Sequence, residues 1–63
     1  MTPAELRSFR SEYRLRQIDL AELLGVTRLC IVRWEGGSRS IPPYVRLALQ
    51  ALADAFRRNG ASA

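Results

Sequence analysis

Two arginines and two aliphatic residues share one side of a short predicted helix. Arg28, Leu29, Val32 and Arg33 stand one, four and five residues apart, so they are neighbours on a helix surface. An arginine can donate paired hydrogen bonds to guanine O6 and N7, and aliphatic side chains can pack on thymine methyl groups. We interpret these four residues as candidate base contacts in a DNA major groove. The alternative is that Leu29 and Val32 cover a hydrophobic neighbour and the arginines only solubilise the helix.

The overall charge agrees with a polyanionic partner. Ten basic residues, all of them arginines, stand against six acidic residues and give a net charge of +4. The guanidinium group is permanently charged and suits phosphate and guanine better than an ammonium group does. A basic surface that serves only solubility is the alternative interpretation of the charge.

The composition argues against disulfide, metal and catalytic chemistry. The chain has 63 residues, no histidine and a single cysteine, Cys30, so we expect no intrachain disulfide and no metal site. Carboxylates do not cluster and no nucleophile has a base beside it, so we expect neither an enzyme nor a cofactor or small-molecule ligand. We expect Cys30 to be a small packing residue, with redox sensing as the alternative. Neither a signal peptide nor a membrane span is evident, so a cytoplasmic protein is expected.

The elements that must position the candidate contacts are all helical. The patterns predict one all-α domain over residues 1–63, with helices at about 3–13, 17–24, 28–35 and 43–58. Thr2, Pro3 and Glu5 form a capping box with proline at the first helical position. Gly25 suits a sharp turn between the second and third helices, and Thr27 can cap the third helix. Apolar residues of the second helix are Leu20, Ala21, Leu23 and Leu24.

One charged pair is expected inside the domain. Arg10 lies on the apolar stripe of the first helix, where an unpaired charge would be costly. Glu35 is the only acidic residue in or near the third helix. We predict a structural ion pair between them that orients the third helix. Arg7 and Arg14 are interpreted as ordinary surface charge.

The chain resembles the lambda-repressor/Cro-like helix-turn-helix family, in particular its short single-domain regulators from phages and mobile elements. The resemblance covers roughly residues 4 to 52. It rests on these residues: Gln17, Leu20, Ala21, Leu24, Gly25, Val26, Thr27, Ile31, Arg33, Trp34, Glu35 and Gly37, with Arg10, Pro42, Val45, Ala48, Leu49 and Leu52. It implies a four- to five-helix domain whose third helix enters the major groove of double-stranded DNA.

The resemblance also implies contacts to the DNA backbone. Gln17 begins the second helix, where family members hold a phosphate with the side-chain amide and main-chain N–H groups. Further expected phosphate contacts are Arg16, Thr27, Gly36, Ser38 and Arg39. For Arg39, plain solvation of a loop is an equal alternative.

Two features depart from the family pattern. Arg16 stands where a capping residue is usual, so the second helix is expected to fray at its start or to be drawn toward a phosphate. The segment after Pro42 reads as one long helix, whereas family members more often have two short ones.

The last helix carries more apolar surface than one core requires. Val45, Leu49, Leu52 and Phe56 form a ridge suited to the core. A second ridge consists of Tyr44, Leu47, Ala51 and Ala55. We expect the second ridge to form a homodimer interface, which would present two recognition helices to successive major grooves.

The sequence therefore favours a dimeric, sequence-specific DNA-binding repressor that controls its own promoter. The alternative is an antitoxin-type interaction module, which neutralises a partner protein and autoregulates its operon. Only residues 59–63 follow the last predicted helix, so the sequence offers little toxin-binding extension.

Overall fold

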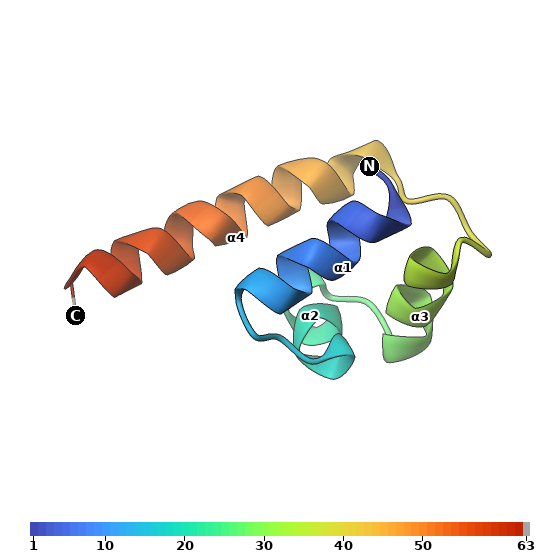
Figure 1. The fold of residues 1–63 in the computed structure, drawn as a ribbon, viewed down its shortest axis with the longest axis horizontal. Helices are drawn as coiled ribbons and strands as arrows, with labels where there is room; N and C mark the ends of the chain where they lie inside the picture. The colour runs from blue at the N-terminus through green and yellow to red at the C-terminus, as the bar shows by residue number, and fades with distance from the viewer. Residues whose placement is uncertain (63) are drawn as a thin grey trace.

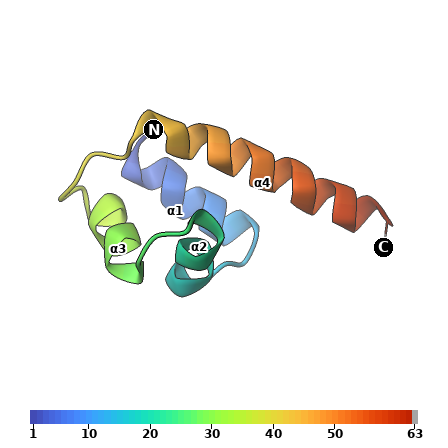
Figure 2. The ribbon, with the colours of Figure 1, turned by 180° about the vertical axis from the view of Figure 1, so that it is seen from behind.

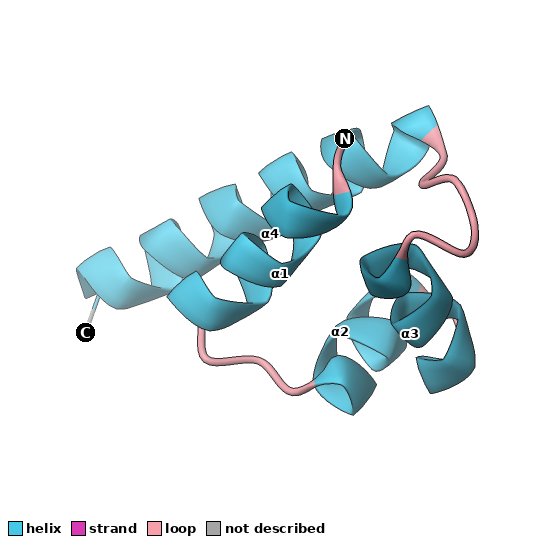
Figure 3. Cartoon of the chain, turned by 45° about the vertical axis from the view of Figure 1, so that its right-hand side comes forward, coloured by secondary structure: helices cyan, strands magenta, loops and turns pink. Residues whose placement is uncertain are grey.

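Four α-helices and no strand make up the part of the chain that the structure describes, residues 1–62. In this computed structural model the helices are α1 (Pro3–Glu12), α2 (Gln17–Leu24), α3 (Arg28–Gly36) and α4 (Pro43–Ser62) (Figure 1). α1 and α4 lie side by side in one layer, seen from both sides of the molecule (Figure 2). α2 and α3 form a second layer on the far side of α1 from α4 (Figure 3). The predicted all-α class is confirmed, with four helices.

The first helix begins as its sequence predicts. The Thr2 hydroxyl accepts the Glu5 N–H at 3.2 Å, and the Glu5 carboxylate accepts the Thr2 N–H at 2.8 Å. The helix ends at Glu12, one residue earlier than predicted, with Tyr13 as its C-cap. Arg14 follows at φ 55°, a left-handed conformation that favours glycine.

The second helix has a better start than we expect from Arg16. The Asp19 carboxylate accepts the Arg16 backbone N–H at 2.9 Å and pairs with the Arg16 guanidinium at 3.0 Å. Asp19, three residues into the helix, therefore supplies one half of a capping box, while Arg16 offers no side-chain acceptor to the first N–H groups of the helix.

The turn between α2 and α3 follows the predicted residue chemistry. Gly25 adopts φ 71°, the left-handed conformation that a glycine accepts cheaply, and the Val26 N–H donates to the Ala21 carbonyl at 2.9 Å. The Thr27 hydroxyl accepts the Cys30 N–H at 3.2 Å and caps α3. α3 includes Gly36, one residue more than predicted, before Gly37 ends it at φ 79°.

A small apolar core joins all four helices. Its buried residues are Leu6, Leu20, Ala21, Ile31, Trp34, Val45 and Leu49. Leu52 packs partly buried against this core, and the ring of Phe56 lies 5.1 Å from that of Tyr13, so the predicted core ridge of α4 faces inward. Leu23 is 45% exposed, and its predicted place on the apolar side of α2 is wrong. On an eight-residue helix, Leu20, Ala21 and Leu24 already fill the inward arc.

The last helix is longer than its sequence pattern predicts. α4 continues through Asn59 and Gly60 to Ser62, so the predicted end at Arg58 is wrong. A glycine inside a helix costs about 1 kcal/mol relative to alanine, which is why the pattern places the end before Gly60. Residue 63 of the predicted tail lies outside the described residues.

Candidate nucleic-acid interface

The exposed side of α3 carries the four predicted base contacts together. Arg28, Leu29, Val32 and Arg33 are all exposed, Leu29 by 54% and Val32 by 37%. We call these four residues the α3 outer face. On the opposite side of the helix Ile31 and Trp34 are buried in the core. Leu29 and Val32 are thus not buried by a hydrophobic neighbour within the described chain.

The two arginines of the α3 outer face differ in how they are held. Arg28 Nη2 donates to Gln17 Oε1 at 3.3 Å, which ties the first residue of α3 to the first residue of α2. The Arg33 guanidinium makes no hydrogen bond or ion pair with any residue in the described chain. One guanidinium is therefore oriented by the protein, and the other is free to meet a ligand.

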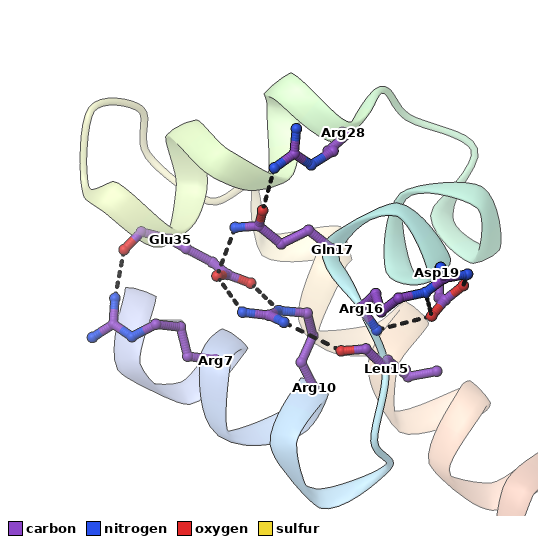
Figure 4. Close-up of polar contacts among 8 residues, drawn as sticks. All are labelled: Arg7, Arg10, Leu15, Arg16, Gln17, Asp19, Arg28 and Glu35. Carbon is purple, nitrogen blue, oxygen red and sulfur yellow. Dashed lines mark hydrogen bonds and ion pairs between the residues drawn. The ribbon is translucent and has the colours of Figure 1, made fainter.

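The orientation of Arg28 depends on a chain of polar contacts that runs into the domain. Gln17 lies between Arg28 and Glu35, and its Nε2 donates to Glu35 Oε1 at 3.3 Å (Figure 4). An ionised carboxylate can only accept, so it requires the amide nitrogen of Gln17 on its side. The amide oxygen is consequently directed to Arg28. Gln17 keeps only one further N–H, because its other donor is used by Glu35.

The predicted ion pair anchors this chain. Arg10 Nε donates to Glu35 Oε2 at 2.5 Å and Arg10 Nη2 to Glu35 Oε1 at 2.8 Å, while Nη1 donates to the Leu15 carbonyl at 3.2 Å. The side chain of Glu35 is 6% exposed and that of Arg10 is 22% exposed. The hydrogen bonds to Glu35 raise the pKa of the Arg10 guanidinium above its ordinary value. The pair joins the α1 stripe to the end of α3, as predicted.

Arg7 belongs to the same cluster, and its interpretation as ordinary surface charge is wrong. Arg7 Nη1 donates to the backbone carbonyl of Glu35 at 2.5 Å, close to the end of α3 (Figure 4). The last carbonyls of a helix lack partners inside the helix and favour a cation nearby. The available signal was its spacing, since Arg7 stands three residues before Arg10 and shares its side of α1.

Two of the predicted phosphate contacts are already used inside the chain. The Arg16 guanidinium is paired with Asp19, which raises the pKa of Arg16 and lowers that of Asp19. The Thr27 hydroxyl accepts a backbone hydrogen bond and keeps only its own O–H as a donor. Arg16 must therefore share its charge with a carboxylate before it can meet a phosphate.

The remaining predicted phosphate contacts lie at the two ends of the α3 outer face. Gln17 is half-buried at the start of α2, where no side chain caps the first N–H groups. Gly36, Ser38 and Arg39 are exposed in the last turn of α3 and the loop after it. The Arg39 guanidinium has no partner among the described residues. These donors flank the exposed arginines.

The predicted dimer residues lie on a different part of the molecule. Tyr44 is 59% exposed, Leu47 is 68% exposed, Ala51 is exposed and Ala55 is half-buried. We call these four residues the α4 outer ridge. It belongs to the layer farthest from α3, so contacts on the α4 outer ridge and on the α3 outer face do not compete for space.

The described residues show no arrangement suited to metal chemistry, since no three His, Cys, Asp or Glu side chains among them gather to hold an ion. Cys30 is half-buried beside the core, as expected of a packing residue. None of the four helices, over the residues described, has both the length and the apolarity needed to cross a membrane. Comparison of the chain with protein-family models, curated proteins and solved structures gives no significant match.

Proposed function

We propose that the protein is a dimeric, sequence-specific regulator that binds double-stranded DNA and acts in the bacterial cytoplasm as a repressor of its own promoter. In this proposal α2 and α3 form a helix-turn-helix of the lambda-repressor/Cro-like type. α3 lies in the major groove and α2 crosses the phosphate backbone.

The observation that carries the proposal is the composition of the α3 outer face. Arg28 and Arg33 offer paired donors for guanine, while the exposed Leu29 and Val32 offer apolar contact for thymine. A face that only kept the protein in solution would not need two large aliphatic side chains in water. Leu29 keeps 54% and Val32 keeps 37% of its surface exposed, so a partner that is both anionic and locally apolar suits them best.

The rigidity of the site supports the same proposal. Specific readout requires that donors be held in place before the ligand arrives. Gln17 holds Arg28, and Glu35 holds Gln17 through a carboxylate that Arg10 fixes with two hydrogen bonds. A polar chain of this kind can orient a reader of bases while it also holds α3 against α1.

Phosphate contacts would set the register on the duplex. The uncapped start of α2 and the unpaired Arg39 can each meet a backbone phosphate on opposite sides of α3. Such contacts give affinity without reading sequence, and the affinity falls with salt. A repressor of this size would act by occupying the DNA that RNA polymerase needs.

The direct test is selection of binding sites from a pool of random double-stranded DNA. The expected product is a near-palindrome whose half-sites are centred about one helical turn apart. Arg33→Ala should lose base preference at one position of each half-site and keep salt-dependent affinity. Arg46→Ala is the matched control, because it removes one exposed arginine from α4, where Arg46 pairs with Glu5.

Two results would overturn the proposal. The first is a pool that remains unenriched by the wild-type protein, which is the outcome expected of a module that binds another protein and does not read DNA. The second is an Arg46→Ala variant that loses base preference as much as Arg33→Ala does, because a general loss of charge would then explain the effect.

A further inference from the structure

We propose that the α4 outer ridge binds the same ridge of a second copy in antiparallel orientation, with Ala51 of the two copies facing each other at the two-fold axis. This inference rests on the dimer of the proposed function and adds its interface, its direction and its register. The occupant is another copy of this chain, because the ridge complements itself in size and in charge.

The ridge is apolar, exposed and separate from the core ridge of the same helix. Leu47, at 68%, is the most exposed large hydrophobic residue of the described chain, and Tyr44 follows at 59%. Val45 and Leu49 face the core and are 1% and 3% exposed. At about 100° per residue, the outer ridge and the core ridge lie roughly 125° apart around the helix axis.

The size of the side chains changes along the ridge and sets the direction of pairing. The large residues Tyr44 and Leu47 stand in its first half, and the small Ala51 and Ala55 stand in its second half. Antiparallel pairing about Ala51 places Leu47 of one copy against Ala55 of the other, so large side chains meet small ones. Parallel pairing would set large against large at one end and leave a void between alanines at the other.

Charge favours the same direction. Arg57 and Arg58 stand near the end of α4, and Asp54 forms an ion pair with the Arg57 of its own helix. A parallel pair would bring the two sets of arginines together, whereas an antiparallel pair separates them by the length of the ridge. Arg58 then falls opposite Tyr44 of the second copy, where an aromatic ring attracts a cation. The helix dipoles also oppose each other only in the antiparallel pair.

The resulting dimer places both α3 helices on one side. The two-fold axis of the antiparallel pair is perpendicular to the plane that contains both α4 helices, and rotation about this axis leaves any direction parallel to it unchanged. Because the core ridge lies roughly 125° from the outer ridge, each core is displaced from that plane, and both cores are displaced toward the same side. In each copy α1 lies between α4 and the layer formed by α2 and α3 (Figure 1). Both α3 helices therefore lie on the same side of the α4 pair. The two Tyr44 residues are offset by about 21 Å along the helix axis at 1.5 Å per residue. α3 lies near the start of α4, which carries the two α3 helices farther apart still.

Disulfide trapping tests the direction and the register. Single cysteines are placed at position 51, 47 or 55 by Ala51→Cys, Leu47→Cys or Ala55→Cys, each in a Cys30→Ala background that removes the native thiol. A disulfide needs Cβ atoms about 3.5–4.5 Å apart, whereas two residues 47 would be offset by roughly 12 Å in the antiparallel pair. We expect Ala51→Cys to give a disulfide-linked dimer, Leu47→Cys alone to stay reduced, and a mixture of Leu47→Cys and Ala55→Cys to give the mixed dimer.

The outcomes separate the pairing from the proposed function. Rapid homodisulfide formation by Leu47→Cys would show a parallel pair, and failure of all three combinations in protein that retains wild-type helicity would remove the α4 interface; either result overturns the inference. If the uncross-linked protein still selects a near-palindromic site, the DNA-binding proposal survives that failure. If the expected disulfides form but no DNA sequence is enriched, the pairing stands and the proposed function falls.

Discussion

Arg10 and Glu35 form a two-bond ion pair between α1 and the end of α3, with Nε–Oε2 and Nη2–Oε1 distances of 2.5 and 2.8 Å. The same carboxylate accepts the Gln17 amide, and the Glu35 carbonyl accepts Arg7. One nearly buried acidic residue therefore fixes the position of α3 relative to α1 and directs the polar contact that holds Arg28. Stability and recognition share this residue.

Removing one partner of the Arg10–Glu35 pair should lower the free energy of unfolding more than replacing both partners with apolar residues. Arg10→Met leaves the Glu35 carboxylate 6% exposed and without its main partner. We expect a loss of about 2–3 kcal/mol in the free energy of unfolding. This is at or below the loss usual when a fully buried ion pair is broken, because Arg10 is partly exposed. The double variant Arg10→Met, Glu35→Leu should be more stable than Arg10→Met alone. Urea denaturation followed by circular dichroism measures both, and equal stability of wild type and Arg10→Met would refute the structural role of the pair.

Removing the Gln17 amide should loosen Arg28 without unfolding the domain. Gln17→Met keeps the side-chain length and removes the bonds to Glu35 and Arg28. We expect unfolding to become easier by about 1 kcal/mol. In site selection, preference at the one base pair read by Arg28 should weaken while preference at the Arg33 position persists. Gln50→Met, on the exposed side of α4, is the matched control; an unchanged motif with Gln17→Met would show that Arg28 needs no support.

Replacing Arg14 with glycine should stabilise the domain. Its φ of 55° closes the turn after α1, where the Leu15 N–H donates to the Arg10 carbonyl at 2.8 Å. A non-glycine residue pays a steric cost in this conformation, so Arg14→Gly should raise the free energy of unfolding by about 0.5–1 kcal/mol after the flexibility of glycine in the unfolded chain is counted. The melting temperature tests this, and a drop would mean that the Arg14 side chain makes a stabilising contact of its own.

Acid should selectively remove the contribution of Asp19. The hydrogen bonds from the side chain and backbone of Arg16 lower the pKa of Asp19, so its contribution to stability is full above the ordinary aspartate pKa of about 3.9 and is lost as the pH falls through the lowered folded value. Wild type should therefore melt higher than Asp19→Asn near neutral pH, and the gap should narrow as the pH falls below the ordinary aspartate pKa of about 3.9. Glu5, whose pKa its contacts with Thr2 also lower, is present in both proteins and cancels from the comparison. A gap that stays constant with pH would contradict the assignment.

Sequence predicted the elements well where a local signal existed. The capping box at Thr2, the left-handed Gly25 and the Thr27 cap each depend on residues within a few positions of one another, so they could be predicted without tertiary structure. The Arg10 and Glu35 pair could be predicted as well, because a charge on an apolar stripe demands a partner and only one acidic residue was in reach.

The features that the sequence did not predict depend mainly on tertiary contacts and on the direction of side chains. The Asp19 carboxylate accepts the Arg16 N–H at a local spacing that the sequence already offered. Arg7, in contrast, donates to a carbonyl 28 residues away, which no local pattern encodes. The bond between Gln17 and Arg28 likewise depends on how α2 and α3 are placed by the turn. The continuation of α4 through Gly60 shows that the last turns of this helix accommodate one glycine, a residue that usually ends the pattern.

The most direct measurement of the central claim is the map of backbone amide chemical-shift changes when a selected duplex is added to ¹⁵N-labelled protein. We expect the largest changes on the α3 outer face, Arg28, Leu29, Val32 and Arg33, and on the start of α2 at Gln17. Smaller changes are expected at Ser38 and Arg39, and little change at Glu5 and Ser8, on the exposed side of α1. Largest changes on α1 or α4, with α3 unaffected, would contradict the claim that α3 reads the DNA.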